Sequence, residues 1–251
     1  MVEKYSVLEN AEEFYFPGNE IGVLVSHGFT GTTQSMYDIG KQIAERGFTV
    51  YGPRLTGHGT HQEDMERASY QDWIGNVEAG VEKLKETCSS LFVVGLSMGG
   101  TLSLYLAEND PEIAGIMPIN AATNLPEMES YYHEIKDGEE RFVDGIGSDI
   151  KKDGVEELAY PKTPVKSMGD LLALMNMVRK DLEKITVPTL IFSSTIDHVV
   201  PPDNSLEIYQ NISSDDKSIV ILENSYHVAT LDNDKDMIAK KCISFIRKHT
   251  K

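Results

Sequence analysis

Residues 91–108, LFVVGLSMGGTLSLYLAE, decide the fold of this 251-residue chain. The stretch begins with an apolar run typical of a buried strand and ends with the apolar spacing of a helix. Between the two, Gly95, Ser97 and Gly99 fit the pattern G-x-S-x-G, in which a strand turns sharply into a helix. Such a turn strains the backbone of the serine and leaves no room for side chains two positions away. The stretch therefore predicts that Ser97 is a nucleophile, exposed at the edge of a sheet.

Strands and helices are predicted to alternate along most of the chain. Apolar runs rich in β-branched residues indicate strands, and apolar residues at helical spacing indicate helices. Strands are expected at residues 21–26, 48–52, 91–95, 113–119, 189–193 and 218–222, and helices at 32–46, 70–87, 98–109, 204–210 and about 232–248. The segment 54–69 is expected to be a polar loop. This order predicts the α/β class, with a mostly parallel central sheet and helices on both faces.

The alternation breaks between Asn120 and about Lys184. The first part of this segment is charged and rich in glycine, without a clear strand, whereas SMGDLLALMNMVRKDL, residues 167–182, carries a broad apolar stripe that includes Leu174 and Met177. Two interpretations stay open: a core helix, or a lid helix whose adaptable methionines also meet a ligand. We expect one domain, residues 1–251, with a cap insertion at about 120–184.

Composition and charge narrow the possible partners. The chain has 23 Lys and Arg against 40 Asp and Glu, a net charge of −17, which repels phosphate backbones and argues against nucleic acid. No apolar run approaches the roughly 18 residues of a membrane span, and the first residues lack the features of a signal peptide. We therefore expect a cytoplasmic protein with no integral membrane segment, a monomer or a homodimer. Cys88 and Cys242 are expected to be reduced structural thiols.

A serine nucleophile needs a base, and the base needs an orienting acid. In the fold class that carries this motif, the chain order is Ser, then Asp or Glu, then His. Asp197 and His227 follow two of the last predicted strands, so they are predicted to be the acid and the base. Adjacent residues at a strand end usually point apart, so His198 is expected to face away from the site. The competing acids Asp203 and Asp232 are each expected to cap the helix that follows.

The oxyanion of an acyl-transfer intermediate needs two preorganised N–H donors. One is expected from Met98, the residue after the nucleophile. The other is expected from Phe29, in the glycine-containing loop SHGFTGT, residues 26–32, which follows an early strand. His27 in this loop is interpreted as a bracing residue.

No cofactor and no metal are expected. GFTGTT has glycines but lacks the lysine of a phosphate-binding loop, and no G-x-G-x-x-G opens a helix. His58, His61, Glu63 and Asp64 could bind a metal chemically, but their spacing matches no compact metal site. We interpret them as residues that organise a loop.

Five segments in chain order, HGFTG, PRLTGHGTHQEDMERASYQDW, GLSMGG, DHVVPP and NSYHVATLD, resemble the bacterial monoacylglycerol lipases and their carboxylesterase relatives. These enzymes belong to the α/β-hydrolase superfamily, and the likeness runs essentially from end to end. It implies an α/β-hydrolase fold with a small cap. It also implies a serine hydrolase that cleaves carboxylic esters through an acyl-enzyme, with Ser97, Asp197 and His227 as the triad and Phe29 and Met98 as the oxyanion hole.

The resemblance extends to the substrate site. Glu157, in EELAY, matches the cap carboxylate that lies near the glycerol hydroxyls, although its neighbour Glu156 could take this place. Ile146, in DGIGSD, matches the apolar cap residue over the acyl path, and Leu174 and Met177 are candidates for contact with the acyl chain. A polyol head and one acyl chain favour a monoacylglycerol. A broad short-chain carboxylesterase, a thioesterase or amidase, and a non-catalytic binding protein on the same fold remain alternatives.

Overall fold

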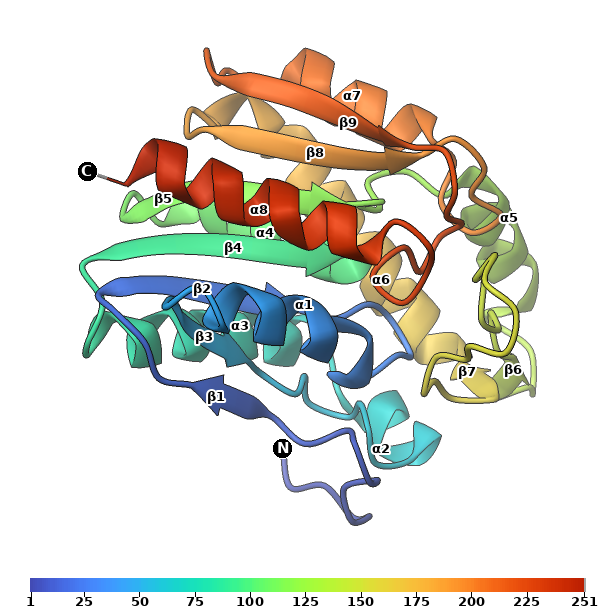
Figure 1. Ribbon diagram of the computed structural model, residues 1–251. Helices are drawn as coiled ribbons and strands as arrows, with labels where there is room; N and C mark the ends of the chain where they lie inside the picture. The colour runs from blue at the N-terminus through green and yellow to red at the C-terminus, as the bar shows by residue number, and fades with distance from the viewer. Residues whose placement is uncertain (251) are drawn as a thin grey trace.

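The computed structural model describes residues 1–250, and at its centre lies one seven-stranded sheet (Figure 1). The strands in spatial order are β1 (Phe14–Phe16), β3 (Thr49–Gly52), β2 (Ile21–Ser26), β4 (Ser90–Leu96), β5 (Ile113–Ile119), β8 (Thr189–Ser194) and β9 (Lys217–Leu222). All neighbours pair in parallel except β1, which is antiparallel to β3. The predicted mostly parallel sheet is confirmed. Strand β1 was not predicted because three residues are too few to show a periodic pattern.

Helices cover both faces of the sheet. One face carries α1 (Gln34–Ala44) and α8 (Lys235–His249), and the other carries α3 (Tyr70–Lys85), α4 (Met98–Asn109), α6 (Val165–Asp181) and α7 (Asp203–Asn211). In β4, Leu91 and Val93 pack on the side of α3 and α4, while Phe92 and Val94 pack on the side of α1 and α8. The strand is thus buried on both faces, which is why its sequence is continuously apolar.

The first part of the insertion between β5 and β8 lies beyond the carboxyl ends of the parallel strands, whereas its helix α6 packs against α3 and α4 (Figure 1). The insertion consists of α5 (Pro126–Ile135), β6 (Phe142–Asp144), β7 (Lys162–Pro164), α6 and the 3₁₀ helix η1 (Leu182–Lys184). Strands β6 and β7 pair antiparallel in a separate two-stranded sheet. The first, charged part of the insertion was predicted to have no clear strand, and β6 contradicts this, because a strand of three residues within a charged stretch leaves no alternating pattern.

The segment predicted as a polar loop contains a short helix, α2 (Gln62–Arg67). The His61 side chain caps this helix by accepting from the N–H of Glu63. The buried carboxylate of Asp64 accepts from the N–H groups of Lys4 and Tyr5 at 2.8 and 3.0 Å. These side chains organise the loop and the N-terminal segment.

Two predicted helix caps were wrong. Helix α8 has Asp234 as its N-cap, not Asp232, and α7 has Pro202, so that Asp203 is the first helical residue. Asp232 is fully buried and binds other main-chain groups.

Cys88 and Cys242 are buried and unpaired. No helix within residues 1–250 combines the length and the apolar character that crossing a bilayer requires. Across the same described residues, no group of three or more His, Cys, Asp or Glu side chains is arranged to hold a metal ion.

Candidate active site

Ser97 lies on the turn between β4 and α4 with φ at +55°. A Cβ on Gly95 would lie 2.0 Å from the carbonyl oxygen of Gly99, and a Cβ on Gly99 would lie 2.2 Å from that of Ser26. Only glycine fits at these two positions. The turn therefore holds Ser97 in the strained conformation typical of a nucleophile elbow, and its side chain lines a pocket at the carboxyl edge of the sheet.

Asp197 and His227 meet beside this pocket. Nδ1 of His227 lies 2.8 Å from Oδ2 of Asp197, and the two side chains are only 8% and 2% exposed. Oδ1 of Asp197 accepts from the N–H groups of Val199 and Val200 at 2.9 and 2.7 Å, which fixes the orientation of the carboxylate. His198 points elsewhere, and its side chain is 59% exposed.

The pKa of His227 is set by opposing effects. Burial by itself would lower this pKa, because it disfavours the charged imidazolium. The hydrogen bond and the charge of Asp197 act in the opposite direction, and the carboxylates of Glu157 and Asp149 add to them. As a result, the pKa of His227 is raised above 6.5.

Phe29 and Met98 approach Ser97 from two elements. Among the residues that the structure describes, neither of their N–H groups has an acceptor. The loop that carries Phe29 lies so close to Ser97 that a Cβ on Gly28 would be only 3.2 Å from Cβ of Ser97. Glycine at position 28 permits this approach. Two free N–H groups beside a serine can bind a developing oxyanion.

His27 braces the Phe29 loop from behind. Its Nδ1 donates to the carbonyl of Gly28 at 2.9 Å, and its Nε2 accepts from the N–H of Leu55 at 3.2 Å. Burial lowers the pKa of His27 to about 4, so the ring is neutral and can play both roles. The bond to Gly28 fixes the peptide unit that carries the Phe29 N–H.

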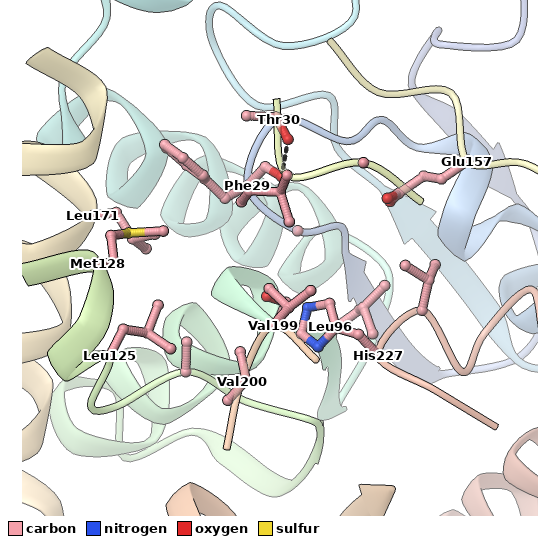
Figure 2. Close-up of a pocket in the computed structure, with 16 residues that line it drawn as sticks. Phe29, Thr30, Leu96, Leu125, Met128, Glu157, Leu171, Val199, Val200 and His227 are labelled. Atoms are coloured by element: carbon pink, nitrogen blue, oxygen red, sulfur yellow. Dashed lines mark hydrogen bonds between the residues drawn. The ribbon is translucent and has the colours of Figure 1, made fainter. Parts of the chain in front are cut away.

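The pocket has two chemically different sides (Figure 2). An apolar side is lined by Ala122, Leu125, Met128, Leu171, Val199 and Val200. The carboxylate of Glu157 lies on the opposite side, with His227 between the two. Ile146 also lines the pocket and remains 38% exposed. The arrangement suits a ligand with an apolar chain and a polar head.

Glu157, not Glu156, faces this pocket. Glu156 is exposed, while Glu157 is half-buried, and burial raises its pKa to about 7. The Gln34 side chain binds the main chain on both sides of Glu157. Its Nε2 donates to the carbonyl of Glu156 at 3.2 Å, and its Oε1 accepts from the N–H of Leu158 at 3.1 Å. The position of Glu157 is therefore set by α1.

Helix α6 reaches the pocket through Leu171, whereas Leu174 and Met177 lie outside its lining. Leu174 is completely buried in the core, and Met177 packs against that core. Most of the apolar stripe of α6 therefore faces the core, as the interpretation of a core helix predicts, and only Leu171 also meets the pocket.

Two residues beside the site, Asn120 and Asp149, were not singled out from the sequence. Asn120, with φ at +43°, accepts from the N–H of Ser194 and donates to the carbonyl of His227, both at 2.8 Å. It thereby joins the ends of β5 and β8 to the His227 loop. A polar residue directly after a buried strand is a signal that could have identified Asn120. Asp149, which contacts His198 and His227, lies in an irregular stretch without any such signal.

A parallel sheet with a serine on the strained turn after β4 and a buried Asp–His pair at the same edge is the arrangement of a serine hydrolase with the α/β-hydrolase fold. The model of the family described as "Serine aminopeptidase, S33" matches residues 19–234, and the chain belongs to this family.

The chain is 51% identical over 251 residues to a thermostable monoacylglycerol lipase of Bacillus sp. (strain H-257), with 99% of each chain covered. It is 32% identical to a carboxylesterase of Bacillus subtilis (strain 168), over 94% of this chain and 96% of that one. A solved structure reported under "LipS and LipT, two metagenome-derived lipolytic enzymes" superposes with a TM-score of 0.94 at 47% identity, covering 97% of this chain and 100% of that one.

Proposed function

We propose that the protein hydrolyses monoacylglycerols to a fatty acid and glycerol through an acyl-enzyme intermediate. The observation that carries the proposal is the pocket itself, in which an apolar side and the carboxylate of Glu157 lie on opposite sides of His227. The 51% identical monoacylglycerol lipase supports the same substrate class.

The proposal assigns a role to each residue of the site. His227 takes the proton from Ser97 as Oγ attacks the ester carbonyl, while Asp197 orients the imidazole through Nδ1 and stabilises its charged form. The N–H groups of Phe29 and Met98 bind the oxyanion. His227 then protonates the departing glycerol and later activates the water that releases the fatty acid.

The pocket divides the substrate between its two sides. The acyl chain packs against Leu125, Met128 and Leu171, which line the pocket together with Ile146 of the cap at about residues 120–184. Glu157 accepts hydrogen bonds from the glycerol hydroxyls. Leu174, in the core, and Met177, which packs against the core, lie behind this surface. A triacylglycerol would bring two further apolar chains toward a carboxylate, which is unfavourable.

The nucleophile is tested by Ser97→Ala on a short-chain p-nitrophenyl ester. We expect turnover to fall by several orders of magnitude, because the covalent route is lost and only binding and the oxyanion hole remain. Retention of most activity would contradict the assignment.

The head group is tested by comparing a monoacylglycerol with the methyl ester of the same acyl chain. At a pH above the acid limb, Glu157→Gln should lower kcat/KM for the glycerol ester about tenfold and leave the methyl ester nearly unchanged, because only the former has hydroxyls to bind. Glu156→Gln is the matched control, since this neighbour is exposed. Equal rates on both esters would indicate a broad carboxylesterase instead.

Other outcomes would indicate other functions. A single stoichiometric reaction without turnover would indicate a binding protein. Faster cleavage of thioesters or amides than of esters would indicate a different hydrolase.

We further propose that the enzyme acts in the cytoplasm, as a monomer or homodimer, on a small-molecule ester. Its buried free thiols, Cys88 and Cys242, are compatible with a reducing compartment.

A further inference from the structure

Asp149 lies in the cap, three residues after Ile146, and its side chain contacts two loops of the site. Oδ2 accepts from the main-chain N–H groups of His198 and His227, each at 3.1 Å. Oδ1 lies 2.7 Å from Nδ1 of His198, and the carbonyl of Asp149 accepts from the N–H of Val228 at 3.0 Å. One cap residue thus binds both the loop of the proposed acid and the loop of the proposed base.

A second carboxylate makes the reciprocal contact. Asp232 is fully buried in the main body of the fold, five residues after His227. Its two oxygens accept from the N–H groups of Lys151 and Lys152 at 2.7 and 3.0 Å, and Oδ2 also accepts from the N–H of Tyr226 at 2.9 Å. The carboxylate of Asp149, in the cap, therefore binds main-chain groups of the main body, and the carboxylate of Asp232, in the main body, binds main-chain groups of the cap.

We propose that Asp149 is a positioning residue for the catalytic base, and that Asp149 and Asp232 together lock cap residues 149–152 to the His227 loop. The inference rests on the proposed function, in which His227 is the base. Carboxylate acceptors bind main-chain N–H groups more strongly than neutral acceptors do, and removing one leaves buried donors unpaired. Ile146, which lines the pocket, lies three residues before Asp149, so these contacts also restrain where Ile146 lies relative to His227.

Asp149 also acts on His227 through its charge. The carboxylates that face His227 are Asp197, from the loop after β8, and Glu157 and Asp149, from the cap. Each favours the protonated imidazole, so removing the charge of Asp149 lowers the pKa of His227. A residue with only a structural role would not have this effect on the pH profile.

The proposal is tested with Asp149→Ala and Asp149→Asn in the full chain, by measuring kcat, KM and the pH profile of kcat/KM on a short p-nitrophenyl ester. We expect Asp149→Ala to lower kcat about tenfold or more, with KM changed much less, because the base is misplaced while the pocket remains. Asp149→Asn keeps an acceptor oxygen, so its kcat should fall less. The acid limb of the kcat/KM profile of Asp149→Asn should move to lower pH, because the charge beside His227 is lost. This second variant keeps the test valid if Asp149→Ala does not fold.

Two matched variants separate position from charge. His198→Ala removes the side-chain partner of Asp149 but keeps both main-chain bonds, and should leave kcat within about twofold. Asp153→Asn removes an equal charge from an exposed residue of the same segment and should change neither kcat nor the acid limb. Wild-type kcat and an unmoved acid limb in both Asp149 variants would overturn the proposal.

A serine-directed fluorophosphonate distinguishes this failure from failure of the proposed function. Its rate of reaction with Ser97 depends on the base and requires no knowledge of the substrate. If the wild-type protein reacts with the probe but does not cleave monoacylglycerols, the proposed substrate fails, and slower labelling of Asp149→Ala still supports the positioning role. If the wild-type protein does not react with the probe, both proposals fail.

Discussion

A Cβ atom on Gly31 would lie 2.5 Å from Oε1 of Glu157, so the carboxylate of Glu157 occupies the space that a side chain at position 31 would need. Gly31→Ala should displace the end of a flexible side chain without disturbing the backbone. We expect kcat/KM for a monoacylglycerol to fall several-fold, while hydrolysis of a methyl ester of equal chain length is nearly unchanged. Parallel kinetics on the two esters check this. A proportional loss on both would show that the substitution damages the nucleophile site instead.

Asp197→Asn should lower kcat by roughly 10³ to 10⁴-fold, because the amide cannot stabilise the imidazolium and favours the wrong tautomer of His227. Steady-state kinetics measure the loss, and circular dichroism monitors the fold. Asp203→Asn, at the exposed start of α7, is the matched control and should remain close to wild type. An active Asp197→Asn enzyme would rule out the proposed acid.

Glu157→Gln should stabilise the fold at pH 8 and leave it nearly unchanged at pH 4.5. Burial raises the pKa of Glu157 from 4.5 to about 7 in the folded protein. Between these two values the unfolded chain loses the proton more readily than the folded protein does, so the carboxyl lowers the free energy of unfolding as pH rises. Above pH 7 the buried carboxylate lowers the free energy of unfolding by its full amount, and glutamine, which carries no charge, removes this destabilisation. Melting temperatures across this range check the sign, and a gain confined to low pH would contradict it.

The same substitution should move the acid limb of kcat/KM to lower pH, since the charge of Glu157 contributes to the raised pKa of His227. The methyl ester is the suitable substrate because it does not need the head-group contact. An acid limb that moves to higher pH would show that Glu157 does not act on the base as an anion.

Gly95→Ala should destabilise the protein by about 3 kcal/mol or more, which lowers the melting temperature by about 10 °C in a chain of this size. Its Cβ would collide with the backbone of the next turn, which cannot move aside as a side chain can. Gly75→Ala in α3 is the control: no atom lies within 4 Å of the added Cβ, and alanine favours a helix by about 0.5–1 kcal/mol. Similar melting temperatures for the two variants would contradict the steric argument.

The pattern of the sequence predicts the main sheet and its helices because those features are local. A strand buried on both faces must be apolar throughout, as residues 91–95 are, and the sharp turn at Ser97 requires glycine on each side. Where local patterns are short, prediction fails: β1, β6 and β7 have three residues each and show no alternation. The candidate acid and base, Asp197 and His227, could be inferred from chain order because parallel strands end at one edge of the sheet.

The chain by itself thus determined the α/β architecture and a serine, an aspartate and a histidine placed at one sheet edge. Only the tertiary structure decided that Leu171 rather than Leu174 reaches the pocket, that Glu157 rather than Glu156 faces it, and that Asp149 binds the His227 loop. The physical reason is that a helical stripe or a charged loop shows which residues could be buried, not which distant segment they meet. Those contacts depend on packing between residues as much as 124 positions apart, as between Gln34 and Leu158.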